Sequence, residues 1–271
     1  MNMKISIVTL FPKMIEGFLN ESIVKRAQEK GVVEIEIINL RDFAIDSYGT
    51  VDDRPYGGGA GMILRVEPIY KVLSKIFNSP FILQGKQFSI FNKKSNSKNQ
   101  KVKTILTSAK GKQFNQTKAK ELSKLDNIII IAGHYEGVDE RILDYVDEEI
   151  SLGDFVMTGG EIAAVAIVDS IVRLLPGVLK KENATEEESF FEVSIDELNS
   201  TVGKNNILEN LVLKGRTSIK LLEYPHYTRP EEFEGKKVPE ILKCGDPKKI
   251  RQWRLKQALV QTLTKRPDLL I

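Results

Sequence analysis

Apolar and polar positions along the chain predict an alternation of strands and helices. Residues 4–10 alternate apolar and polar side chains, which is the two-residue period of a strand. Further strands are predicted at 33–40, 103–106 and 127–132. A helical segment at 14–30, interrupted near Asn20 and closed by Gly31, separates the first two strands. This strand–helix–strand order predicts an α/β fold with a parallel sheet.

Four more helices are predicted in the first two thirds of the chain, at 67–77, 115–125, 139–146 and 161–175. The last is apolar over most of its surface, so it is expected to be buried against the sheet or against a second subunit. A basic amphipathic helix is predicted at 247–263, with Trp253 on its apolar side.

Three segments lack a clear period. Residues 41–62 are interpreted as a flexible surface loop or as a lid or RNA-facing loop, and residues 78–100 as a surface insertion that includes a candidate hairpin. Residues 191–220 are interpreted as a tolerated insertion with short strands at 191–195 and 211–213. The predicted organisation is therefore a domain at 1–179, a linker with an insertion at 180–217, and a basic helical domain at 218–271.

The net charge of +3 hides an uneven distribution of charge. Residues 212–271 hold 14 Lys and Arg against 7 Asp and Glu, and residues 84–124 hold 11 Lys against the single Glu121. Basic strips of this kind favour a polyanion through counterion release, although a solvated lysine-rich surface has the same composition.

Cysteine use and hydropathy narrow the class of protein. Cys244 is the only cysteine, so an internal disulfide is excluded and a reducing compartment is expected. His134 and His226 are the only histidines, too few for a His/Cys zinc cluster in one chain. No apolar run approaches about 18 residues, and the N-terminus lacks a signal-peptide pattern. We expect a cytoplasmic protein without a membrane span.

Three glycine-containing turns follow predicted strands, at 107–111, 133–137 and 151–161. Ligands of open α/β sheets bind beyond the carboxyl ends of the strands, so these loops are expected to form one pocket. In the third turn, Gly153, Gly159 and Gly160 are expected to adopt positive φ and bring the backbone close to a ligand. The glycines at 57–61 fit neither a dinucleotide-binding fingerprint nor a P-loop.

Several long motifs together resemble the bacterial tRNA (guanine-N1)-methyltransferases of the trefoil-knotted SPOUT superfamily. They are GHYEGVDER at 133–141, SLGDFVMTGGE at 151–161, DSIVRLLPGVL at 169–179 and YPHYTRP at 224–230. The N-terminal IVTLFP, VDDRPYGGGAGM and C-terminal KRPDLL runs belong to the same pattern, which covers nearly the whole chain. The resemblance implies a trefoil knot, a small C-terminal helical domain, a tRNA substrate, and a homodimer whose active site is shared between subunits.

The resemblance also implies which residues contact the methyl donor, S-adenosylmethionine. They are Leu106, Ser108, Gly111, Gly133, Tyr135, Glu136, Gly137, Ser151, Leu152, Gly153, Asp154, Phe155, Val156, Met157, Gly159 and Gly160. Glu136 would lie near the positive end of the donor. Alternatively, its carboxylate has only a structural role and complements the dipole at the start of a helix. Ala109 and Lys110 stand where the family commonly has Pro-Gln. This difference changes the side-chain contacts of the loop, whereas its backbone contacts with the donor are still expected.

Methylation of guanine N1 requires a base, because that nitrogen carries a proton, and a positive group at O6, where negative charge develops. The resemblance places Glu188 at the base position and Arg173 at O6. Neighbouring Glu187 is an alternative base, and a structural pair with Asp169 is an alternative role for Arg173.

The resemblance assigns the target base to His226, Tyr227, Arg229 and Pro230. Magnesium is a candidate cofactor, although the sequence offers no dedicated ligand cluster. The expected activity is methylation of the guanosine immediately 3′ of the anticodon, position 37. A knotted rRNA methyltransferase and a non-catalytic RNA-binding protein are the alternatives.

Overall fold

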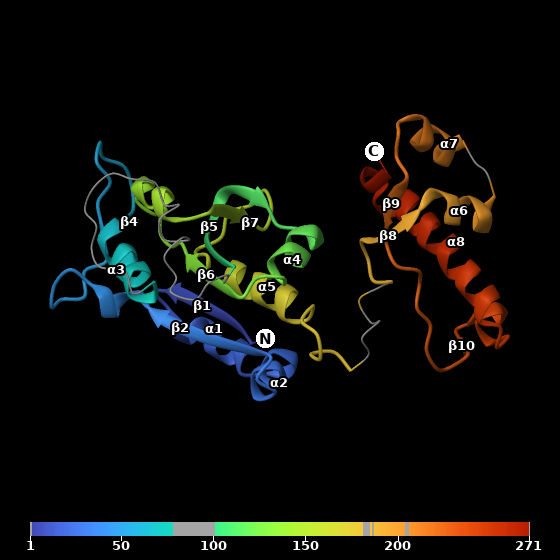
Figure 1. Ribbon diagram of the computed structural model, residues 1–271, viewed down its shortest axis with the longest axis horizontal. Helices are drawn as coiled ribbons and strands as arrows, with labels where there is room; N and C mark the ends of the chain where they lie inside the picture. The colour runs from blue at the N-terminus through green and yellow to red at the C-terminus, as the bar shows by residue number, and fades with distance from the viewer. Residues whose placement is uncertain (1, 78–100, 181–184, 186, 204–205, 271) are drawn as a thin grey trace. The chain divides into compact units, whose positions relative to one another are not determined.

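The computed structural model describes residues 2–77, 101–180, 185, 187–203 and 206–270 (Figure 1). The chain divides into two compact units, Met1–Lys180 and Lys181–Ile271, each with its own hydrophobic core. The candidate insertion at 78–100 lies outside the described residues.

A five-stranded sheet forms the centre of the first unit. Its strands are β1 (Met3–Thr9), β2 (Val33–Asn39), β5 (Val102–Gln113), β6 (Asn127–Ala132) and β7 (Glu148–Ser151), in the order β2-β1-β6-β5-β7. All neighbouring strands pair in parallel, as in the pairing of Ile5 with Ile35 and Ile128. The predicted α/β class with a parallel sheet is confirmed. The strand β5 exceeds its predicted length because it resumes pairing with β7 after a register shift between Thr107 and Lys112.

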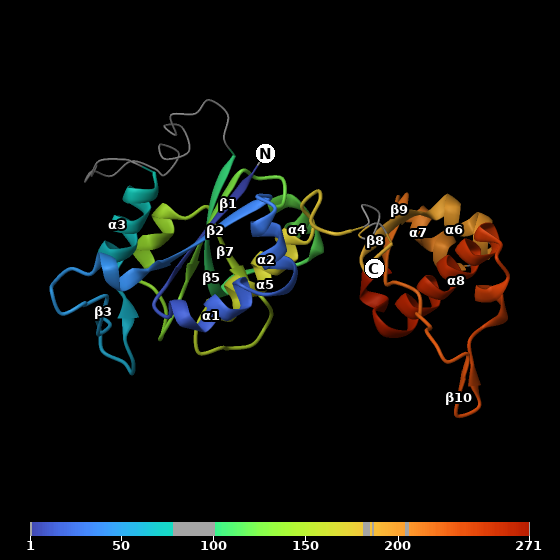
Figure 2. The same ribbon diagram turned by 90° about the horizontal axis from the view of Figure 1, so that it is seen from below.

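Helices cover both faces of this sheet (Figure 2). One face is covered by α1 (Pro12–Leu19), α2 (Ser22–Glu29), α4 (Gln116–Leu122) and α5 (Glu161–Val172). The other face is covered by α3 (Val66–Ile76) and the 3-10 segments Leu40–Phe43 and Glu140–Tyr145. The predicted break near Asn20 is confirmed, whereas the helix predicted at 139–146 is a 3-10 segment. The short strands β3 (Asp52–Asp53) and β4 (Ile63–Leu64) pair antiparallel and close the loop between them.

Burial on both faces explains why the central strands are continuous apolar runs. Ile128, Ile129, Ile130 and Ile131 of β6 are each at most 2% exposed, and successive residues enter opposite cores. Truncating any of them to alanine is expected to cost about 2–5 kcal/mol of unfolding free energy. The helix α5 is buried along most of its length, as its apolar sequence predicts.

The second unit combines helices with short strands. Its helices are α6 (Ile195–Val202), α7 (Asn206–Leu213) and α8 (Pro247–Lys265), with 3-10 segments at Glu240–Lys243 and Pro267–Leu270. The strand pair β8 (Phe191–Ser194) and β9 (Ser218–Leu221) is antiparallel, as is the pair β10 (Glu232–Phe233) and β11 (Lys236–Lys237). Helix α8 matches the predicted basic helix, and the side chain of Asp246 caps its N-terminus.

Residues 191–213, which belong to the predicted linker with an insertion at 180–217, contribute side chains to the core of the second unit. Phe191 and Val193 alternate into a core that also holds Leu208, Leu255 and Leu259. The strand predicted at 211–213 is wrong, because these residues end α7, where Leu208 and Leu211 share one buried face at helical spacing. Within the described residues, no helix combines the length and apolarity needed to cross a membrane.

Candidate functional site

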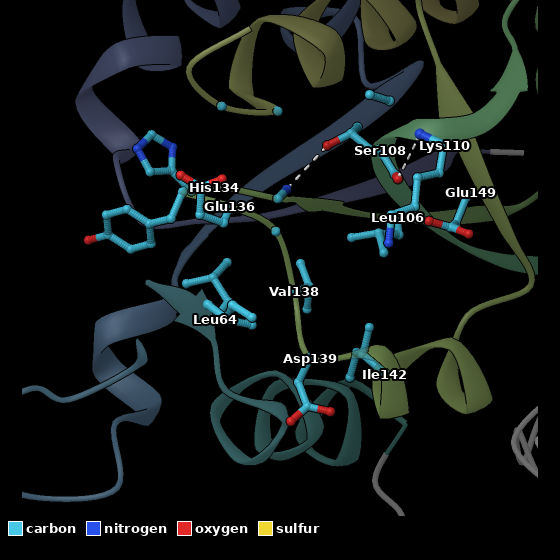
Figure 3. Close-up of a pocket in the computed structure, with 18 of the residues that line it drawn as sticks. Leu64, Leu106, Ser108, Lys110, His134, Glu136, Val138, Asp139, Ile142 and Glu149 are labelled. Carbon is cyan, nitrogen blue, oxygen red and sulfur yellow. Dashed lines mark hydrogen bonds between the residues drawn. The ribbon is translucent and has the colours of Figure 1, made fainter. Parts of the chain in front are cut away.

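Three chain segments border a single cavity of about 1020 Å³ in the first unit. One is the part of β5 between Thr107 and Lys112, where the pairing with β7 shifts register, and the other two follow Ala132 of β6 and Ser151 of β7. These strands are adjacent in the order β6-β5-β7, so the three segments meet on one side of the cavity. Figure 3 shows His134 and Glu136 on one side of the cavity and Ser108 and Lys110 on the other. The prediction that the three segments form one pocket is confirmed, whereas the segment at 107–111 lies within β5 and not beyond its end.

Most residues that the family resemblance assigned to the donor line this cavity. They are Leu106, Ser108, Gly133, Tyr135, Glu136, Gly137, Ser151, Leu152, Gly153, Phe155, Val156, Met157, Gly159 and Gly160. Asp154 is exposed and does not line it, and neither does Gly111. A Cβ on Gly111 would lie 2.5 Å from the backbone nitrogen of Ile150, so this glycine permits the close pairing of β5 with β7. The contact of each residue with a donor remains a prediction.

The glycines of the third loop serve close packing rather than unusual backbone angles. None of Gly153, Gly159 and Gly160 has a positive φ, which corrects the expectation from the sequence. A Cβ on Gly160 would overlap Thr107 Oγ1 and lie 2.8 Å from the backbone nitrogen of Gly133. The loop after β7 therefore passes directly against the ends of β5 and β6. Of the cavity-lining glycines in the predicted donor set, Gly137 has φ +132°, where a side chain would be strained.

A buried carboxylate lies behind this loop. Glu161, the first residue of α5, is 0% exposed, and its Oε1 accepts a 2.9 Å hydrogen bond from Thr9 Oγ1. Its Oε2 lies 3.4 Å from Nδ1 of His134, whose ring lines the cavity. No local sequence signal reveals this arrangement, because Thr9 and Glu161 are 152 residues apart and their pairing depends on the strand order.

Charged residues on the cavity rim are paired with one another. Arg65 contacts Asp53 at 3.1 Å and Glu67 at 3.0 Å, and Arg141 contacts Asp139 at 2.7 Å. The hydrogen bond with Arg65 lowers the pKa of Glu67, and the bond with Arg141 lowers the pKa of Asp139. These carboxylates are therefore ionised at neutral pH and offset the neighbouring arginines.

Arg173 lies at the opposite end of α5 from the cavity. It is the C-cap residue of this helix, whereas Glu161 and Ala163 at the helix start adjoin or line the cavity. Twelve residues at 1.5 Å each place Arg173 about 18 Å from Glu161 along the helix axis. Within one chain, Arg173 is therefore not brought to this cavity.

The remaining candidate residues belong to the second unit. The segment with Glu188 runs beside the chain that leads to His226: the amide of Phe190 donates to Leu221 O at 2.7 Å, and the amide of Glu223 donates to Ser189 Oγ at 3.3 Å. His226 Nε2 lies 3.2 Å from Glu223 Oε2. The structure thus brings the predicted base segment and the predicted substrate motif together within this unit.

Aromatic and cationic side chains surround that motif. The guanidinium of Arg254 lies 4.7 Å from the ring centre of Tyr224, and Tyr227 lies 6.4 Å from Trp253. Arg229 and Pro230 are exposed.

Glu187, the alternative base, takes part in an ion-pair cluster. Glu187 Oε1 accepts a 2.9 Å bond from Arg251 Nη1, and the other Nη of Arg251 binds Glu197 at 2.7 Å. Glu187 therefore already belongs to an ion-pair cluster that joins its segment to α6 and α8. No group of three His, Cys, Asp or Glu side chains suited to a metal ion occurs among the described residues.

The parallel sheet and the glycine-rich segments that wall the cavity define an α/β protein with a candidate small-ligand site beside its sheet. The family model described as tRNA (Guanine-1)-methyltransferase TrmD matches residues 3–271. The chain belongs to this family.

Individual relatives agree over nearly the whole chain. The tRNA (guanine-N(1)-)-methyltransferase of Carboxydothermus hydrogenoformans is 48% identical over 269 residues, which are 99% of this chain and 87% of that protein. The Clostridium botulinum protein of the same name is 45% identical and covers 98% of this chain and 92% of its own. The crystal structure of tRNA (m1G37) methyltransferase from Aquifex aeolicus matches with TM-score 0.67 and 37% identity, covering 100% of this chain and 95% of that chain.

Proposed function

We propose that this chain, a tRNA (guanine-N1)-methyltransferase by family, transfers a methyl group from S-adenosylmethionine to N1 of the guanosine at position 37, immediately 3′ of the anticodon. The observation that carries the proposal is the cavity bordered by part of β5 and by the loops after β6 and β7, in a chain that matches the family over residues 3–271. The m1G37 specificity of the Aquifex aeolicus enzyme supports the position. Because its substrate is tRNA, we expect the enzyme in the cytoplasm.

The cavity suits a donor of this size and polarity. Its volume of about 1020 Å³ lies at the upper end of the roughly 300–1,000 Å³ usual for small-ligand sites. Backbone groups at Gly133, Gly137 and Gly159 would bind the adenine and ribose edges, and the carboxylate of Glu136 would complement a positive sulfur. When bound, S-adenosylmethionine supplies a methyl group activated by its sulfonium charge.

In the proposed reaction, Glu188 removes the N1 proton of guanine. The freed N1 lone pair attacks the methyl carbon, the carbon–sulfur bond breaks, and S-adenosylhomocysteine leaves. Arg173 holds the negative charge that develops at O6. The ordinary pKa of a glutamate is about 4.3, so glutamate alone is a weak base for the N1 proton. The positive charge of Arg173 at O6 would lower the pKa of guanine N1 and so ease removal of this proton. Glu188 is favoured over Glu187 because the family resemblance places Glu188, directly before Ser189 and Phe190, at the base position.

A homodimer would complete the site. Arg173 is about 18 Å along α5 from the start of that helix, where one chain has its cavity. A partner chain related by a two-fold axis would supply the arginine, Glu188 and His226 to the donor held by the first chain. Large apolar side chains are exposed beside the cavity, at Phe155, Val156 and Ile162, with 55%, 89% and 51% exposure. Such a patch fits a subunit interface.

The trefoil knot is part of the proposal. The chain leaves the edge strand β7, and Gly160 N then donates a 2.6 Å bond to Gly133 O, while His134 and Gly159 form a β-bridge. The loop after β7 therefore returns across the loop after β6 before α5 begins. This course supports a threaded connection at the donor cavity.

The second unit is proposed to bind the anticodon stem. The count of 14 basic against 7 acidic residues at 212–271 supports contact with phosphates. Affinity for tRNA is expected to fall steeply between about 50 and 200 mM salt. An affinity that does not change with salt contradicts this assignment.

The deciding experiment is methyl transfer from labelled S-adenosylmethionine to two tRNA transcripts that carry G or A at position 37. We expect label in the G transcript only, at N1. Transfer to ribosomal RNA instead would favour the rRNA methyltransferase alternative, and donor binding without any transfer would favour a non-catalytic RNA-binding protein. Added Mg²⁺ and EDTA test whether magnesium assists.

Two isosteric variants separate the candidate bases. Glu188→Gln is expected to lower kcat by about 10²–10⁴-fold, because a general base is lost. Glu187→Gln removes one exposed ion pair and should leave kcat within about threefold of the wild type. The reverse order of effects would assign the base to Glu187.

A further inference from the structure

A chain of hydrogen bonds links the N-terminal strand to the wall of the donor cavity. Thr9 ends β1, Glu161 begins α5, and His134 follows β6. Thr9 Oγ1 donates to Glu161 Oε1 at 2.9 Å, and Glu161 Oε2 lies 3.4 Å from His134 Nδ1. Three segments far apart in the sequence thus meet at one carboxylate.

The burial of this carboxylate makes its partners important. Glu161 is 0% exposed and Thr9 is 1% exposed, so water does not replace a lost partner easily. A carboxylate only accepts hydrogen bonds, so the tautomer of His134 with its proton on Nδ1 is the one that would donate to Glu161. The position of Glu161 at the start of α5 adds the favourable end of the helix dipole.

The loop after β7 is shaped around this pair. A Cβ on Gly159 would overlap both His134 Nδ1 and Glu161 Oε2, so only glycine leaves room for the two side chains to meet there. Gly159 also forms a β-bridge with His134, and both line the cavity. The ring of Phe11 packs 4.7 Å from the imidazole, and the amide of Phe11 donates to Thr9 Oγ1. These contacts fix the imidazole and the glycine loop to the same buried anchor.

We propose that Thr9, Glu161 and His134 form a positioning chain that holds the β6 loop and the glycine loop in the shape that binds the donor. Their role is to set donor affinity, and they take no part in the transfer itself. This inference rests on the proposed function, since it takes the cavity to be the donor site.

A matched pair of threonine variants tests the proposal. Thr9→Val removes the hydroxyl that anchors Glu161 without lining the cavity. Thr104→Val makes the same change at a 0% exposed hydroxyl of β5 that has no hydrogen-bond partner among the described residues. Binding of S-adenosylhomocysteine is measured by calorimetry. We expect about tenfold weaker binding for Thr9→Val, with unchanged tRNA affinity and little change in kcat at saturating donor, and wild-type binding for Thr104→Val.

A second pair acts at the histidine and remains informative if Thr9→Val does not fold. His134→Asn keeps an N–H near the Nδ1 position, whereas His134→Leu keeps the bulk and removes the donor. His134→Leu should weaken binding about tenfold, and His134→Asn should recover most of the loss.

The outcomes separate this inference from the proposed function. Equal binding by Thr9→Val and Thr104→Val, or by the two His134 variants, overturns the positioning chain. A parallel loss of kcat at saturating donor would also overturn it, because the residues would then act on the transfer. Wild-type protein that binds no S-adenosylhomocysteine would instead contradict the proposed function.

Discussion

Replacing Gly159 with alanine is expected to weaken donor binding and to lower the unfolding free energy, while most molecules remain folded. The added methyl group would overlap His134 Nδ1 and Glu161 Oε2 and would lie 2.8 Å from His134 Cε1, so the imidazole and the carboxylate must separate. Overpacking of this kind costs about 1–3 kcal/mol. Loss of a hydrogen bond to a buried carboxylate adds about 1–3 kcal/mol. The sum, about 2–6 kcal/mol, is smaller than most of the roughly 5–15 kcal/mol range of domain stabilities, so most molecules should remain folded at low temperature.

The assay combines urea unfolding with calorimetric binding of S-adenosylhomocysteine. Gly17→Ala is the matched control, because Gly17 lies in α1, has no positive φ and has no atom within 4 Å of an added Cβ. That control should gain about 0.5–1 kcal/mol, since alanine is the better helix residue. A Gly159→Ala protein as stable as the wild type, with unchanged donor affinity, would refute the packing argument at this loop.

Three further substitutions test separate contacts. Thr104→Val should raise the unfolding free energy by about 1 kcal/mol in urea titrations, because it removes a buried hydroxyl that lacks a partner among the described residues. Arg141→Gln should raise the pKa of Asp139 in an NMR titration, because the hydrogen bond with Arg141 lowers that pKa in the folded protein. The pair therefore stabilises the fold at pH values above the ordinary carboxyl pKa of about 4. This stabilisation is lost as the pH falls from there through the lowered pKa of the folded protein. Arg251→Gln breaks two exposed ion pairs and should lower stability by at most about 1 kcal/mol in thermal unfolding; a larger loss would mean that the cluster with Glu187 anchors the second unit.

Local sequence patterns predicted the helices and strands that are specified by residues close together in the chain. The period-two run at 4–10, the break near Asn20 and the basic helix at 247–263 each have a local signal, and each is present in the structure. The convergence of three glycine-containing segments on one pocket also followed from the sequence, because parallel strands direct their carboxyl ends to one edge. The resemblance, rather than periodicity, supplied the chemical roles.

The misinterpreted features depend on contacts that sequence patterns do not encode. Leu208 and Leu211 have helical spacing within a segment too short for a clear period, so a strand was predicted at 211–213 in place of α7. The role of Gly159 could not be deduced, because its neighbours His134 and Glu161 meet it only after the strands are ordered β2-β1-β6-β5-β7. A charged residue at a helix start looks exposed from the sequence, yet Glu161 is fully buried.

The central place of β1 in the sheet affects how the protein is made on the ribosome. β1 is synthesised before its neighbours: β6 begins at Asn127, which is 127 − 9 = 118 residues after Thr9, and the carboxylate that Thr9 binds lies 152 residues after Thr9. At about 5–20 residues per second, the 118 residues that precede β6 take roughly 6–24 s. During this time β1 has only β2 beside it, and its other edge is open to pairing with foreign strands. Until β6 emerges, a chaperone that covers this open edge would protect the nascent chain from such pairing.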